Sequence, residues 1–105
     1  MSVTGRRRLP NRRLNETFSL QSQGLSYVAT ASFFDDARLA EIFLNNHKAD
    51  SSADIGARDA AIACSIALQY GADLETIRKA LCRDTRGKAN GPLGVALDLI
   101  ADCER

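Results

Sequence analysis

The sequence has few of the residues from which disulfide frameworks and metal sites are built. It contains three cysteines, Cys64, Cys82 and Cys103, with no CxxC pair, and a single histidine, His47. An odd number of cysteines without close pairs does not describe a disulfide framework, and His47 lacks a metal-chelating spacing to them. We therefore expect no metal site and reduced, mostly structural thiols, two of which fall at apolar positions of predicted helices.

Long apolar segments are also missing. No apolar run approaches the roughly 20 residues that a membrane-spanning helix needs, and no apolar stretch of a signal peptide follows the arginine-rich start. These absences predict a cytoplasmic location without membrane attachment. The length of 105 residues suits one domain with one modest core.

Catalytic patterns are absent as well. No Ser/His/Asp or Cys/His spacing stands out, and no apolar pocket that would separate the pKa values of the scattered carboxylates can be recognised. The sequence therefore predicts no catalytic residues and no cofactor, and any activity would be associated with a larger enzyme.

Positive charge is concentrated at the N-terminus, although the net charge is only +1. Residues 1–13 hold no acidic residue and five arginines, which are Arg6, Arg7, Arg8, Arg12 and Arg13. This composition predicts a flexible basic arm at 1–13 attached to a mildly acidic domain at 14–105. Such an arm could bind nucleic acid or an acidic partner, or could be a solvated tail, since no aromatic residue is interleaved to stack on bases.

Residues 14–44 show the alternation of an antiparallel meander. Apolar and polar residues alternate over 14–21 and again over 25–33, with a turn at 21–24 that contains Gly24. A second turn is predicted at 35–38, where alanine takes a place that glycine would fill more easily, and a third strand at 39–44. Short turns between strands predict hairpins, one face of which must be covered by apolar residues.

Three helices are predicted to provide the cover. Residues 52–70 carry one apolar stripe and, beside it, a second one formed by Ile62, Ile66 and Tyr70, so this central helix is expected to be packed on several sides. Asp73 caps a second helix that ends near 82–83, and Pro92 begins a third. The predicted fold class is α+β, a three-stranded antiparallel β-meander followed by three helices packed on one face.

Residues 27–82 resemble the TSCPD domain. The resemblance lies in a hairpin that ends with RLAEIFLNN, a polar corner followed by a helix, and the passage GADLETIRKAL. This domain is the C-terminal accessory module of adenosylcobalamin-dependent ribonucleotide reductases, and it also occurs as small stand-alone bacterial proteins.

Several features of those reductases are missing from the sequence. It has no T-S-C-P-D string, no closely spaced C-terminal cysteine pair, and too few residues for a radical-forming barrel with a cobalamin pocket. The resemblance therefore implies the fold and a non-catalytic accessory role, in which the module docks on a larger enzyme or self-associates. Two alternatives stay open: a nucleic-acid or nucleotide-binding protein that uses the arginine arm, and a reductase-related redox protein that uses Cys82 or Cys103.

Two polar segments are candidate ligand sites. The first is the corner after the third strand, where the amides and the imidazole could bind a nucleotide or phosphate; its residues are Asn45, Asn46, His47 and Lys48, together with Arg58 and Asp59 from the following helix. The alternative is that the asparagines satisfy turn backbone groups and that Arg58 and Asp59 form a surface ion pair. The second is the loop before the third helix, where Arg83, Arg86 and Lys88 could bind an anion or nucleic acid, or simply form an ordinary capped turn.

Overall fold

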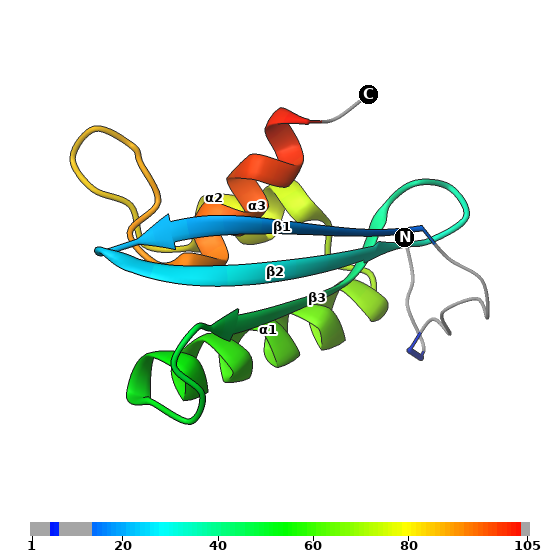
Figure 1. Cartoon of the computed structure of the whole chain (residues 1–105). Coiled ribbons are helices and arrows are strands. Elements are labelled where there is room, and N and C mark those ends of the chain that lie inside the picture. The colour runs from blue at the N-terminus through cyan, green and yellow to red at the C-terminus, as the bar shows by residue number, and fades with distance from the viewer. Residues whose placement is uncertain (1–4, 7–13, 104–105) are drawn as a thin grey trace.

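Three antiparallel strands and three helices make up the computed structural model, which describes residues 5–6 and 14–103. In chain order the elements are β1 (Asn15–Ser22), β2 (Leu25–Phe33), β3 (Leu39–Asn46), α1 (Ser52–Gln69), α2 (Leu74–Ala80) and α3 (Pro92–Asp102). The strands lie in the order β1-β2-β3, and each neighbouring pair is antiparallel (Figure 1). The predicted α+β meander with three helices is confirmed.

Both hairpin turns contain residues whose backbone lies in the left-handed region, with positive φ. Gln23 and Gly24 form a two-residue turn in which both φ angles are positive, 54° and 76°. This type I′ geometry matches the twist of the flanking strands. The second turn places Ala37 at φ 71°, where a side chain costs about 1–2 kcal/mol relative to glycine.

Two predicted boundaries were wrong. β3 continues beyond the predicted residue 44 to Asn46, because Asn46 still pairs with Tyr27 of β2. α2 ends at Ala80 instead of near 82–83, because Leu81 is extended, with ψ 159°, and Arg83 forms a bridge with Ala89.

One face of the sheet builds the core. Alternate side chains of each strand, such as Leu20, Ala29 and Ile42, are buried against the helices. The opposite face is exposed and consists mainly of hydroxyl and amide side chains interrupted by Val28 and Phe43, which are 44 % and 45 % exposed. The free face is therefore neither strongly apolar nor basic.

Side chains of α1 close the outer edge of β3. The Ser65 hydroxyl accepts a hydrogen bond from the Ile42 N–H at 2.8 Å and donates one to the Ile42 carbonyl at 2.9 Å. Further along the helix, the Gln69 amide donates to the Ala40 carbonyl at 3.1 Å. Because an outer strand would otherwise present unpaired backbone groups, α1 replaces part of a fourth strand along β3.

The first turn of α1 completes this contact. The Asp54 carboxylate is buried and accepts hydrogen bonds from the backbone N–H groups of Asn46 and Asp50, both at 2.9 Å. The Ser51 hydroxyl accepts from the Asp54 N–H at 3.1 Å and caps the helix. Asp54 therefore joins the end of β3 to the start of α1.

The third helix crosses the buried side of β1; in Figure 1 it begins behind the sheet and ends above β1. Its Leu93, Ala96 and Leu97 are buried in the core. Before α3, the Arg83 guanidinium donates to both carboxylate oxygens of Asp98, at 2.8 Å and 2.7 Å, and holds the 84–91 loop against the helix.

Candidate interaction surface

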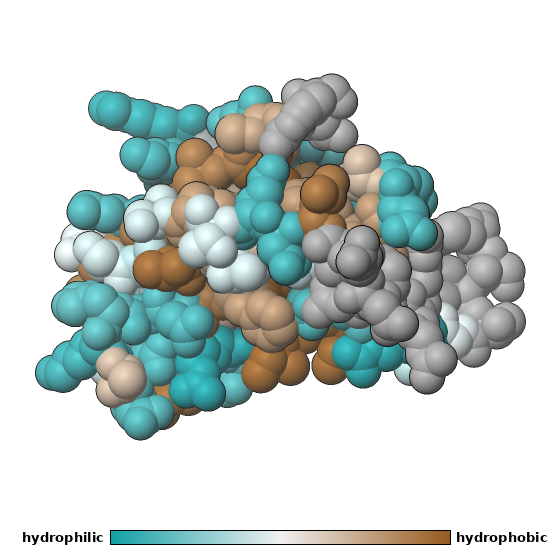
Figure 2. Space-filling view, turned by 45° about the vertical axis from the view of Figure 1, so that its right-hand side comes forward, coloured by the Kyte–Doolittle hydropathy of each residue, from teal (hydrophilic) through white to brown (hydrophobic). Residues whose placement is uncertain are grey.

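A stripe of large apolar side chains runs along the outer side of α1. It consists of Ile55, Ile62 and Ile66 of α1 and of Tyr70 at the C-cap of the helix, which are 49 %, 51 %, 40 % and 48 % exposed. Figure 2 shows apolar groups reaching the surface on the lower side of the molecule, where α1 lies in Figure 1. We call these four residues the outer stripe.

The outer stripe corrects the expectation that the central helix is packed on several sides. Its members are spaced seven, four and four residues apart, so they lie along one helical face. The opposite side of α1, with small residues such as Ala57 and Ala61, is the one that packs against β3 and the core. Isolated surface isoleucines are common, but a row of four large apolar residues on one helix is typical of a binding surface.

The predicted polar corner is largely used by the fold itself. Asn46 is buried; its amide donates to the Ser26 carbonyl at 3.1 Å and its side-chain oxygen accepts from the Lys48 N–H at 3.0 Å. Asn45, His47 and Lys48 are exposed. At this corner the side chains of Asn45, His47 and Lys48 therefore reach the surface, while the buried side chain of Asn46 forms hydrogen bonds with backbone groups.

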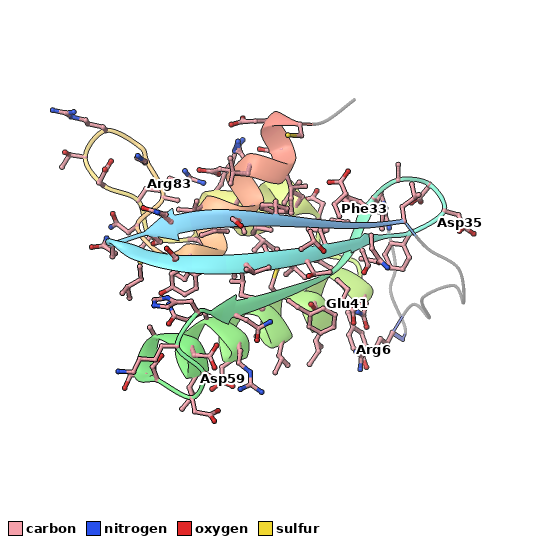
Figure 3. The ribbon with its side chains drawn as sticks, in the orientation of Figure 1. Arg6, Phe33, Asp35, Glu41, Asp59 and Arg83 are labelled. Atoms are coloured by element: carbon pink, nitrogen blue, oxygen red, sulfur yellow. The ribbon has the colours of Figure 1, made fainter. Side chains whose placement is uncertain are left out.

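Arg58 lies beside the same junction. Its guanidinium is 3.5 Å from the Asp54 carboxylate and 3.6 Å from that of Asp50. Hydrogen bonds from the N–H groups of Asp50 and Asn46, together with Arg58, hold the pKa of the Asp54 carboxyl below its usual range. Asp59 instead projects from the outer side of α1 (Figure 3). Ligand binding at this corner stays a prediction.

The residues predicted to bind anions are not gathered in one place. Arg7, Arg8, Arg12 and Arg13 lie outside the described residues, while the Arg6 guanidinium donates to the Gln69 side chain at the end of α1. Arg83 lies at the opposite end of the sheet from Arg6 (Figure 3).

The 84–91 loop offers less positive charge than its sequence indicated. The Arg83 guanidinium is committed to Asp98 and to the carbonyl groups of Arg78 and Gly87. Arg86 and Lys88 remain exposed, but their backbone N–H groups both donate to the Asp84 carboxylate. The Asp84 carboxylate and the backbone N–H groups of Arg86 and Lys88 thus form an ordinary hydrogen-bonded turn.

An open groove of about 470 Å³ lies between the β2–β3 turn and the start of α2. Its apolar side chains include Leu39, Leu68, Leu74 and Ile100, and its charged ones include Asp36, Arg38, Asp73 and Glu75. Asp73 is the N-cap of α2, and hydrogen bonds from Thr76 keep the pKa of its carboxyl low. Sequence reasoning missed this groove because its walls come from all six strands and helices and from two turns, which lie far apart in the chain.

The three cysteines have different surroundings. Cys64 is buried in the core, and burial raises the pKa of its thiol to about 11, so it is a small apolar side chain at neutral pH. Cys82 and Cys103 are exposed, so only one of the two predicted apolar positions is buried. Within residues 5–6 and 14–103, no group of three or more His, Cys, Asp or Glu side chains is placed to hold a metal ion.

The buried polar residues of α1 were also missed as a set. Asp54, Ser65 and Gln69 lie on the side of the helix that faces β3. Their spacing, eleven and then four residues, is a helical period and was visible in the sequence. What the sequence did not show is that a strand edge with unpaired backbone groups lies opposite them.

Comparison with known proteins gives one informative similarity. No family model matches the chain, and no solved structure matches it. In the part of the chain that the structure describes, no helix has the length and apolar character needed to cross a bilayer. The chain is 37 % identical over 70 residues, 67 % of its own length, to the vitamin B12-dependent ribonucleotide reductase of Agrobacterium fabrum (strain C58). It spans only 6 % of the length of that enzyme, so the similarity is to a small region of a ribonucleotide reductase.

Proposed function

We propose that the chain is a non-catalytic accessory module of the TSCPD type that docks on a larger protein through the outer stripe. The observation that carries the proposal is the row of half-exposed Ile55, Ile62, Ile66 and Tyr70 on a helix whose other side is fully used by the fold. Full burial of an exposed apolar side chain contributes roughly 1.5–3 kcal/mol, and these residues, which are 40–51 % exposed, would gain about half of that each on docking.

The similarity to a reductase region indicates the class of partner. The region to which the chain is similar makes up only 6 % of a B12-dependent ribonucleotide reductase, so this similarity favours the remainder of such an enzyme as the class of partner. The partner we propose is accordingly the large catalytic chain of a reductase of that type. Asp59 lies within the helical face of the outer stripe, so a basic group on the partner would complement it.

The test is recovery of the partner with a double variant. Ile62→Lys with Ile66→Lys places two charges in the outer stripe without touching the buried side of α1. In native purification of the tagged chain, we expect wild type to retain a B12-dependent reductase, identified by mass spectrometry, and the variant to lose more than about tenfold of it.

The matched control places two lysines elsewhere. Ala80→Lys with Thr85→Lys alters exposed positions on α2 and in the 84–91 loop. It should retain the partner as wild type does. Recovery of the wild-type chain without any reductase, or equal recovery by the Ile62/Ile66 variant, would contradict the proposal.

The two alternative functions gain no support from the described residues. Arg83 is held by Asp98, and Arg6 lies at the other end of the sheet, so these arginines do not form a continuous basic surface. Nucleic-acid binding by residues 7–13, and redox chemistry at the exposed Cys82 or Cys103, stay predictions.

A further inference from the structure

The two outer strands of the sheet differ in how their edges are treated. Along β3, side chains of α1 bond the backbone groups of Ala40, Ile42 and Asn46. β1 is the other outer strand; α3 crosses it on the buried face and then extends past the strand (Figure 1), and no described residue bonds to the outward backbone groups of β1.

The pairing register shows which groups of β1 point outward. The Leu14 carbonyl accepts from the Phe33 N–H at 3.1 Å, so Leu14 and every second residue after it bond to β2. The backbone N–H and C=O groups of Asn15, Thr17, Ser19 and Gln21 therefore point away from the sheet. All four residues are exposed, and no described residue bonds to these backbone groups.

The open edge lacks most of the features by which natural sheets discourage pairing, and Glu16 is its one charged residue. β1 has eight residues, no proline, no lysine and no register shift against β2. By contrast, the pairing of β3 with β2 shifts register where Ser32 and Phe33 of β2 meet β3, and side chains of α1 bond to the outer edge of β3. An edge of this length whose outward backbone groups bond to no described residue is a template for another strand.

We infer that the β1 edge pairs antiparallel with β1 of a second copy of this chain, which joins two sheets into one of six strands. A two-fold axis at Phe18 would set Thr17 opposite Ser19 and Asn15 opposite Gln21 of the second copy, with matched donors and acceptors.

The charges of β1 favour a second copy as the occupant. Glu16 is the only charged residue of the strand, and the same axis sets it opposite Leu20 of the second copy, so no like charges meet. Phe18 is only partly buried and would meet its own counterpart at the axis. Because each copy has one open edge and one sealed edge, the assembly closes as a dimer instead of growing into a fibre.

The dimer is independent of the proposed docking function, since it uses β1 and not the outer stripe. Thr17→Pro tests it, because the Thr17 N–H takes no part in the β1–β2 ladder and proline is tolerated at such edge positions. Thr17→Ala is the control, since it changes the side chain but keeps the N–H.

The mass of the full chain should be measured by light scattering over a wide range of concentrations. We expect wild type and Thr17→Ala to reach the dimer mass, and Thr17→Pro to weaken dimerisation by more than about tenfold. The Ile62→Lys with Ile66→Lys variant should still dimerise. A monomer of wild type at every concentration, or a dimer of Thr17→Pro as strong as wild type, would overturn the inference.

A second measurement keeps the test valid if Thr17→Pro fails to fold. Hydrogen exchange on wild type should show the Thr17 and Ser19 amides becoming protected as concentration rises through dimerisation. Dimerisation with no added protection of these two amides would place the interface elsewhere and overturn the inference.

Discussion

Replacing Asp54 by alanine should lower the melting temperature by about 10 °C. The substitution removes the acceptor for the backbone N–H groups of Asn46 and Asp50, the first of which is buried. It also removes the contact that joins β3 to the first turn of α1. Asp59→Ala is the control on the same helix, because Asp59 is exposed, and it should leave the melting temperature nearly unchanged.

The stabilising effect of Asp54 should depend on pH. The N–H groups of Asp50 and Asn46 favour the ionised carboxylate and lower its pKa in the folded chain below the value of about 3.9 for an unfolded aspartate. A lowered folded-state pKa means that the unfolded chain binds the proton more readily, so this stabilisation is present above pH 4 and is lost as the pH falls further. Thermal unfolding across this range should therefore show wild type and Asp54→Asn converging at acid pH; a constant difference between them would contradict the role of the carboxylate.

Replacing Ser65 by alanine should destabilise the chain by about 1–3 kcal/mol. The Ser65 hydroxyl both accepts from and donates to Ile42, so its loss leaves a buried N–H and a C=O without partners. Chemical denaturation should show a lower midpoint with an unchanged slope. Ser52→Ala, at an exposed position of α1, serves as the comparison, and an equal loss of stability in both variants would show that the β3 edge gains nothing from Ser65.

Local signals explain why the strands and turns could be predicted. Alternation of apolar and polar residues marked β1 and β2, and Gly24 marked the tight turn between them. Asp73 and Pro92 marked the starts of α2 and α3, because capping and the fixed φ of proline act within a single turn. These features depend on neighbours in the sequence, which a single chain displays directly.

The orientation of α1 could not be predicted in the same way. Both of its apolar stripes have a helical period, so the sequence does not say which one faces the sheet. The choice is decided by β3, whose outward backbone groups require polar partners such as Ser65 and Gln69. That requirement turns the smaller residues inward and leaves Ile62 and Ile66 at the surface.

The prediction of ligand sites was limited in the same way, because the sequence does not show which residues a polar side chain contacts in the fold. Arg83 was assigned to anion binding because it adds positive charge to the loop before the third helix, whereas its partner Asp98 lies in that helix, 15 residues away. Asn46 was assigned to a ligand because it is an amide at a strand end, whereas it is buried and satisfies turn groups. A polar residue near a loop has the same appearance in the sequence whether it binds a ligand or completes the fold.

The difference between the two sheet edges underlies both the position of the outer stripe and the proposed dimer. The most direct test is residue-resolved hydrogen exchange at a concentration where the chain is monomeric. We expect the Ile42 and Asn46 amides, which bond to side chains of α1, to exchange at least about a hundredfold more slowly than those of Thr17 and Ser19. Equal exchange rates at the two edges would show that α1 does not seal β3, and would contradict the arrangement from which the docking surface was inferred.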